Sequence, residues 1–140
     1  MEHKISGPAR AGLSIYALDL QRIARFYETV LGMSRVHESP EVVVLQSSDI
    51  QLVLHRIPAD RAATISLSSP PQRRSSAIKF FFTVPDIAIA RSAAQEAGGD
   101  VLLEQWQGPG FVVCDSCDPE GNVFHVRESV ASLKKNSPTN

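Results

Sequence analysis

DLQRIARFYETVLG, residues 19–32, has the apolar spacing of an amphipathic helix and carries a signal for each of its ends. Asp19 is a residue type that caps helix N-termini, because its carboxylate can accept hydrogen bonds from the first free backbone N–H groups. Gly32 suits the left-handed conformation that commonly ends a helix. Between them, apolar residues recur three or four positions apart, which predicts one buried helical face: Leu20, Ile23, Ala24, Tyr27, Val30 and Leu31.

The sequence on both sides of this helix has the alternation of β-strands. Leu13, Ile15 and Ala17 are separated by single residues of another kind, a period of two that is typical of a half-buried strand. After the helix, turn-forming residues separate three further strand-like segments, at residues 34–38, 41–46 and 50–57. The first half of the chain therefore predicts the order βαβββ.

The second half repeats the first. Asp86 follows Asp19 by 67 residues and Gly99 follows Gly32 by the same interval, so helix start and helix end recur without a gap. An internal repeat of this kind outweighs any single local prediction. The expected elements of the second half are strands at 78–84, 101–106, 111–115 and 122–128 and a helix at 87–97.

Length and composition are those of one ordinary domain. The chain has 140 residues, of which 43% are hydrophobic and 21% charged, and its net charge is −1. It therefore has no excess of positive charge that would favour binding to nucleic acid or an anionic membrane. No apolar run is long enough to span a bilayer, and the N-terminus has no secretory core, so we expect a cytoplasmic protein. The domain divides into modules at 11–57 and 77–128, a linker at 58–76 and a tail at 129–140, whose last residues, 134–140, are expected to be disordered.

Cys114 and Cys117 form the only C-x-x-C pair. A zinc site would need a second pair or histidines at matching spacing, and a redox pair would sit at a helix N-terminus. Neither context is present, which favours reduced, inert thiols.

Two motifs in this repeat resemble those of the glyoxalase/bleomycin resistance protein/extradiol dioxygenase family, also called the vicinal oxygen chelate superfamily. One is Asp19-Leu20 with Ala24-Arg25-Phe26-Tyr27 and Val30-Leu31-Gly32; the other is Asp118-Pro119-Glu120-Gly121-Asn122, read as a tight turn. The resemblance covers about residues 11–128. It implies an α+β fold in which two tandem βαβββ modules form a cupped eight-stranded mixed sheet with the helices outside. It says little about function, because this fold hosts several chemistries and some pure binders.

Enzymes of the family hold one divalent metal, and the resemblance places their ligand positions at Gly12, Gln51, Lys79 and His125. Gly12 has no side chain, Lys79 is normally a cation, and Gln51 and His125 bring no negative charge, so the carboxylates that a hard divalent ion requires are missing. We therefore expect no metal and no cofactor. An unfamiliar set of Gln51, His55 and His125 is the remaining alternative.

Strand alternation in the family register predicts which side chains line the cup. The lining would be Gly12, Ser14, Tyr16, Gln51, Val53, His55, Lys79, Phe81, Thr83, Val123, His125 and Arg127. The opposite face would pack beneath the helices: Leu13, Ile15, Leu52, Leu54, Ile78, Phe80, Phe82, Val84, Phe124 and Val126.

The expected lining mixes aromatic surface, hydrogen-bonding groups and positive charge and contains no carboxylate, which is the composition of a small-ligand pocket. The candidate ligand-binding residues are Tyr16, Gln51, His55, Lys79, Phe81, Trp106, His125 and Arg127. Two alternatives without a ligand stay open: the aromatic residues could fill the cup themselves, and Trp106 could be a core or dimer contact. Arg73 and Arg74 in the linker could close over an anion or could simply be solvated.

We interpret the chain as a metal-independent binder of a small, possibly anionic, organic molecule. The alternative is a glyoxalase-type lyase or isomerase, or a dioxygenase, with a non-standard site in which His125 is the catalytic candidate. A third hypothesis is an interaction module with a filled cup. A homodimer is expected, because modules of this family leave strand edges that a second chain commonly covers.

Overall fold

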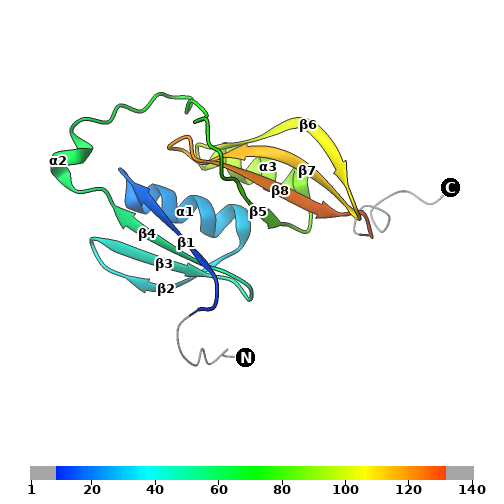
Figure 1. Ribbon diagram of the computed structural model, residues 1–140, viewed down its shortest axis with the longest axis horizontal. Helices are drawn as coiled ribbons and strands as arrows, with labels where there is room; N and C mark the ends of the chain where they lie inside the picture. The colour runs from blue at the N-terminus through cyan, green and yellow to red at the C-terminus, as the bar shows by residue number, and fades with distance from the viewer. Residues whose placement is uncertain (1–8, 132–140) are drawn as a thin grey trace.

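The computed structural model describes residues 9–131 and contains both βαβββ units (Figure 1). Strand β1 pairs in parallel with β4, β4 and β3 are antiparallel, and so are β3 and β2, which gives the sheet order β1-β4-β3-β2. The elements of this first module are β1 Gly12–Ala17, α1 Leu20–Leu31, β2 Ser34–Glu38, β3 Val42–Gln46 and β4 Gln51–Arg56.

The second module repeats this topology with the order β5-β8-β7-β6, and β5 is again parallel to its neighbour β8. The α+β fold expected from the sequence is thus confirmed, with the eight strands divided into two four-stranded sheets. One further short helix, α2 Ala59–Ala62, lies between the modules. The second module consists of β5 Phe80–Thr83, α3 Ile87–Glu96, β6 Asp100–Gly108, β7 Phe111–Cys117 and β8 Val123–Ser129.

Local chemistry fixes the ends of the two long helices. The Asp19 carboxylate accepts a hydrogen bond from Arg22 N at 3.1 Å, and the Asp86 carboxylate accepts one from Ile89 N at 3.0 Å. Gly32 ends α1 at φ 66°, a left-handed conformation that glycine adopts without strain. The predicted caps Asp19, Asp86 and Gly32 are therefore confirmed.

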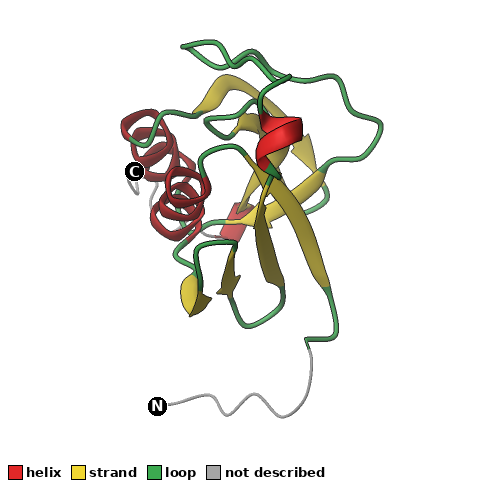
Figure 2. Ribbon diagram, turned by 90° about the vertical axis from the view of Figure 1, so that its left-hand side faces the viewer, coloured by secondary structure: helices red, strands yellow, loops and turns green. Residues whose placement is uncertain are grey.

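Helices α1 and α3 lie on one side of the molecule and the strands on the other (Figure 2). Side chains that alternate toward the helices are buried, including Ile15, Leu52, Leu54, Val43, Leu45, Phe82, Phe124 and Val126. The core is continuous across the two modules, because Phe26 and Tyr27 of α1 contact the ring of Phe124 in β8, at centroid distances of 6.0 and 5.7 Å. The other face of each sheet is left open.

Ile78 was predicted to pack beneath the helices, and this prediction was wrong: Ile78 is 79% exposed. The strand begins later than expected, at Phe80. The Ser76 hydroxyl donates to the carbonyl oxygen of Ile78 and accepts from its N–H, at 2.7 and 3.2 Å. This local turn competes with strand pairing, so Ile78 is not aligned with the apolar face.

The turn from Asp118 to Asn122 joins the two modules. The buried Asp118 carboxylate accepts hydrogen bonds from Tyr27 Oη at 2.8 Å and from the backbone N–H groups of Glu120 and Asn122. Glu120, which is 3% exposed, accepts from Leu18 N and Asp19 N, both at 2.8 Å, just before α1. The two motifs that carry the family resemblance are therefore in direct contact.

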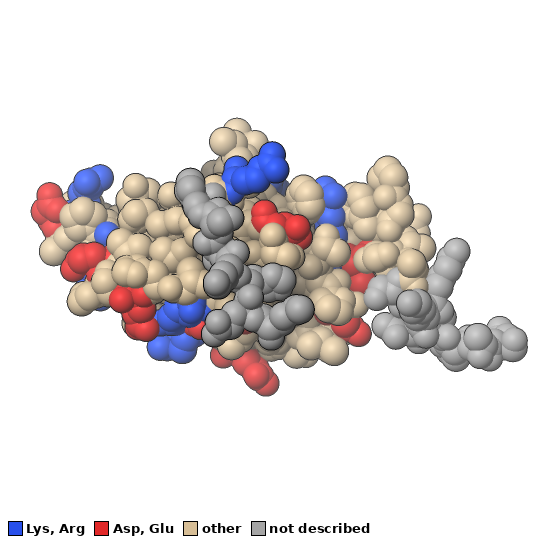
Figure 3. All heavy atoms as spheres, turned by 90° about the horizontal axis from the view of Figure 1, so that it is seen from below, with Lys and Arg blue, Asp and Glu red and all other residues tan. Residues whose placement is uncertain are grey.

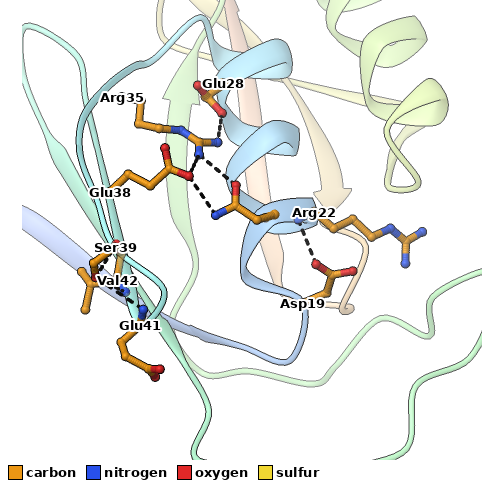
Figure 4. Close-up of polar contacts among 9 residues, drawn as sticks. Asp19, Arg22, Glu28, Arg35, Glu38, Ser39, Glu41 and Val42 are labelled. Carbon is orange, nitrogen blue, oxygen red and sulfur yellow. Dashed lines mark hydrogen bonds and ion pairs between the residues drawn. The ribbon is translucent and has the colours of Figure 1, made fainter.

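A second polar cluster attaches α1 to β2 at the surface (Figure 4). The Arg35 guanidinium forms ion pairs with Glu28 of α1 and with Glu38 of β2, and it donates to the Gln21 side chain at 2.9 Å. These groups bind one another, so we interpret the cluster as structural.

On the face seen in Figure 3, acidic and basic side chains are interspersed rather than gathered into a large area of one sign. That pattern fits the net charge of −1. None of the described helices is long and apolar enough to cross a lipid bilayer.

Candidate functional site

The open face of the second sheet carries two rows of side chains set by strand register. His125 of β8 lies opposite Phe81 of β5 and Asp115 of β7. Arg127, two residues further along β8, lies opposite Thr83 and Val113. Because residues two apart on a strand point to the same side, both rows face away from the helices.

Asp115 is the centre of a charged cluster on this face. Its carboxylate lies 3.0 Å from His125 Nε2, 3.5 Å from Arg73 Nη2 and 3.7 Å from Lys79 Nζ. The expectation that this face carries no carboxylate was therefore wrong. Phe111, Val113 and Asp115 alternate along β7 and therefore share one side of the sheet. The same alternation in the sequence would have predicted this carboxylate on the open face.

Arg127 is held between two aromatic rings. Its guanidinium carbon lies 3.6 Å from the centroid of Phe81 and 4.1 Å from that of Phe111. Its Nε is buried without a hydrogen-bond partner, and no acidic group of residues 9–131 pairs with the guanidinium. The stack fixes the plane of the cation and leaves its terminal nitrogens available to a ligand.

The open face of the first sheet carries an aromatic pair and a hydrogen-bonded pair of amide side chains. Tyr16 of β1 and His55 of β4 are stacked, with ring centroids 4.9 Å apart and an interplanar angle of 18°. Gln51 donates to the side chain of Gln46 at 3.1 Å. Tyr16 is 60% exposed and so offers its outer ring face to a ligand.

The structure thus divides the predicted site residues into two sets. Lys79, Phe81, His125 and Arg127 gather on the second sheet, and Tyr16, Gln51 and His55 on the first. Within residues 9–131, no hydrogen bond, ion pair or ring contact joins the sets. Trp106 lies on β6 opposite Val113 and is 44% exposed.

A cleft of about 550 Å³ lies between the modules, beside the start of β5. One wall is formed by residues 79–83, along the edge of β5, and the other by the β3–β4 turn at residues 47–50 together with Leu31 and Met33. Two of the predicted residues therefore border space that is shared with the first module.

The metal positions implied by the family do not fit a divalent ion. A Cβ on Gly12 would lie 2.8 Å from the carbonyl oxygen of Gln51, so the close approach of β1 and β4 accounts for this glycine. Lys79 and His125 both pair with Asp115. Among the residues that the structure describes, no three His, Cys, Asp or Glu side chains cluster as a metal-binding group.

Both cysteines are buried in β7 and free. Burial raises the pKa of each thiol above its ordinary value, which keeps the reactive thiolate scarce. Cys114 Sγ is also 3.7 Å from Arg91 Nη2. These observations support the interpretation of both as structural thiols.

Two βαβββ modules, each with one sheet face covered by a helix and the other open, define a glyoxalase/bleomycin resistance fold. Residues 13–127 match the family model described as a glyoxalase-like domain. The chain belongs to this family, within the vicinal oxygen chelate superfamily. No curated protein matches the sequence.

Solved structures with the same fold are distant in sequence. A glyoxalase/bleomycin resistance protein/dioxygenase family enzyme from Burkholderia phytofirmans PsJN has a TM-score of 0.63 and 20% identity, over 88% of this chain and 100% of that one. A glyoxalase-related enzyme from Fulvimarina pelagi has a TM-score of 0.59 and 19% identity, over 85% and 86%. A glyoxalase/bleomycin resistance protein from Albidiferax ferrireducens T118 has a TM-score of 0.61 and 16% identity, over 84% and 96%. Sequence identities this low support a shared fold and nothing about function.

Proposed function

We propose that the protein binds a small organic anion on the open face of its sheets, without a metal and in the cytoplasm. The observation that carries this proposal is Arg127, a cation fixed between Phe81 and Phe111 with no acidic partner among the described residues. Arg is suited to planar, bidentate recognition of a carboxylate or phosphate. The exposed aromatic rings nearby would contact the apolar part of the ligand.

Asp115 adds a negative charge to the open face, but the face keeps an excess of positive charge. Arg73, Lys79 and Arg127 bring three permanent positive charges to this face, and Asp115 compensates one of them. Its short contacts are with Arg73, Lys79 and His125, so Arg127 stays uncompensated. Arg127 is therefore a better anchor for an anion than Lys79.

A thermal-shift comparison of benzoate with benzamide tests this proposal, because the two molecules share shape and differ in charge. We expect benzoate to raise Tm more than benzamide, since a ligand that binds the native state stabilises it. In Arg127→Met the two should become equal, whereas Arg25→Met, on the exposed face of α1, should preserve the difference. Equal shifts in the wild-type protein would contradict the anion preference.

Elemental analysis of the purified protein tests metal independence. We expect no divalent ion in stoichiometric amount. One tightly held ion per chain that is lost in His125→Ala would favour the enzyme alternative instead.

That alternative, a glyoxalase-type lyase or isomerase or a dioxygenase with a non-standard site, has one observation in its favour. Asp115 beside His125 Nε2 can orient the imidazole, as carboxylates do for histidines that transfer protons. In this case His125 would be the residue that touches the reacting atoms.

A further inference from the structure

His125 and Arg127 form a pair of polar anchors on one strand. They occupy alternate positions of β8 and therefore the same open face, with Phe81 beside both. A strand advances by roughly 3.3 Å per residue, so positions two apart lie about 7 Å from each other. Two backbone positions this close on one face allow a single small molecule to contact both side chains.

The His125 ring has one nitrogen available for a ligand. Its Nε2 lies 3.0 Å from a carboxylate oxygen of Asp115, a contact that favours a proton on Nε2. In the neutral ring Nδ1 is then the acceptor, and it has no partner among residues 9–131. The imidazole is 32% exposed, so a ligand hydroxyl can reach it.

Asp115 is itself held in place, which makes His125 a fixed rather than a mobile anchor. Arg73 and Lys79, which precede β5, contact different carboxylate oxygens of Asp115. The other anchor is fixed by its aromatic stack. Two preorganised groups at a set spacing discriminate between ligands by length, because neither can move to meet a mismatched one.

We propose that the ligand is a small carboxylate that also carries a hydroxyl group, so that one molecule contacts both anchors. Arg127 binds the carboxylate, with the exposed Thr83 beside it in the register, and His125 Nδ1 accepts the hydroxyl proton in a hydrogen bond. This inference rests on the proposed anion-binding function and deepens it by naming the class of ligand. Asp115 acts as a positioning residue for His125.

Calorimetric titration with benzoate, 4-hydroxybenzoate and 4-methoxybenzoate measures the second contact directly. The hydroxyl of 4-hydroxybenzoate lies at the far end of the ring from the carboxylate, and the methoxy group cannot donate. We expect 4-hydroxybenzoate to bind about three- to tenfold more tightly than the other two, the gain from one net hydrogen bond. A gain shared by 4-methoxybenzoate would overturn the proposal, because it would reflect ring contact rather than donation.

His125→Leu should bring the affinity of 4-hydroxybenzoate down to that of benzoate measured in the same variant, because the ratio of the two affinities reports the hydroxyl contact alone. The matched control is His37→Leu on exposed β2, which should retain the gain. If 4-hydroxybenzoate gains nothing over benzoate in the wild-type protein, or if the gain persists in His125→Leu, the two-anchor inference is wrong and anion binding at Arg127 stands. If benzoate binds no better than benzamide, both proposals fail together. The wild-type comparisons need no variant to fold.

Discussion

At the scale of single residues, the most constrained group outside the site is the Asp118 carboxylate. Burial raises its pKa above the ordinary value, and hydrogen bonds from Asn122 and Tyr27 oppose that rise. Burial also raises the pKa of Tyr27 well above its usual range, so its hydroxyl remains a donor. The pair connects α1 to the β7–β8 turn through the middle of the core.

Tyr27→Phe should reduce the free energy of unfolding by about 1–2 kcal/mol, because it removes one of the donors to a buried carboxylate. The loss should depend on pH. Since the folded pKa of Asp118 is raised, its contribution to stability is greatest when it is protonated and declines as pH rises through that pKa. Removing the Tyr27 donor raises the pKa further, so the variant should lose more stability at neutral pH than at about pH 4.

Urea unfolding at the two pH values measures this difference. Tyr16→Phe is the control, because the Tyr16 side chain is exposed and makes no hydrogen bond to the described residues. A loss for Tyr27→Phe that is the same at both pH values would show that Asp118 does not respond to this donor.

The site residues differ in how far the sequence could reveal them. Alternation along β8 placed His125 and Arg127 on one face, since strand period is a local property. The partners of these residues depend on register between strands distant in sequence. Asp115 meets His125 only because β7 and β8 pair as they do, and Phe111 stacks on Arg127 for the same reason.

At the scale of elements, Glu120 connects the modules most directly. Its carboxylate accepts two backbone N–H groups immediately before α1, where negative charge also favours the helix dipole. Glu120→Ala should cost about 3 kcal/mol, because it leaves both N–H groups without this acceptor. Glu120→Gln should cost less, since an amide oxygen still accepts.

Chemical denaturation of both variants, beside Glu104→Ala on exposed β6, tests this role. The control should change stability by no more than about 0.5 kcal/mol. A Glu120→Ala variant as stable as Glu104→Ala would mean that the turn and α1 hold together without this carboxylate.

Elements with strong local signals were predicted well, and those determined by distant contacts were not. Asp19 and Gly32 mark helix ends through their own backbone chemistry. Helix α2 has a single turn and no periodicity that a pattern could detect. The irregular pairing of β6 between Val101 and Gln105 is stabilised by Arg91, which donates to the carbonyls of Val101 and Leu102 from another element.

At the scale of the whole molecule, each described sheet has two edge strands, β1 and β2 in the first and β5 and β6 in the second. Strand β6 spans nine residues and presents Leu103, which is 81% exposed, and Trp106 near the open face. An exposed strand edge with large apolar side chains tends to pair with another chain. This is the surface on which we base the proposed homodimer.

Sedimentation at roughly tens of micromolar protein, where mass action favours such a complex, should show a dimer. Leu103→Glu should shift the protein toward monomer, because a charge at this position cannot be buried against a second copy without a partner. Ile89→Glu, which alters a residue of α3 that is 69% exposed, should leave the dimer intact. A monomeric wild-type protein would contradict the dimer itself. A dimer weakened by Ile89→Glu and not by Leu103→Glu would instead move the interface to the helical side, leaving the β6 edge and Trp106 free to border the ligand.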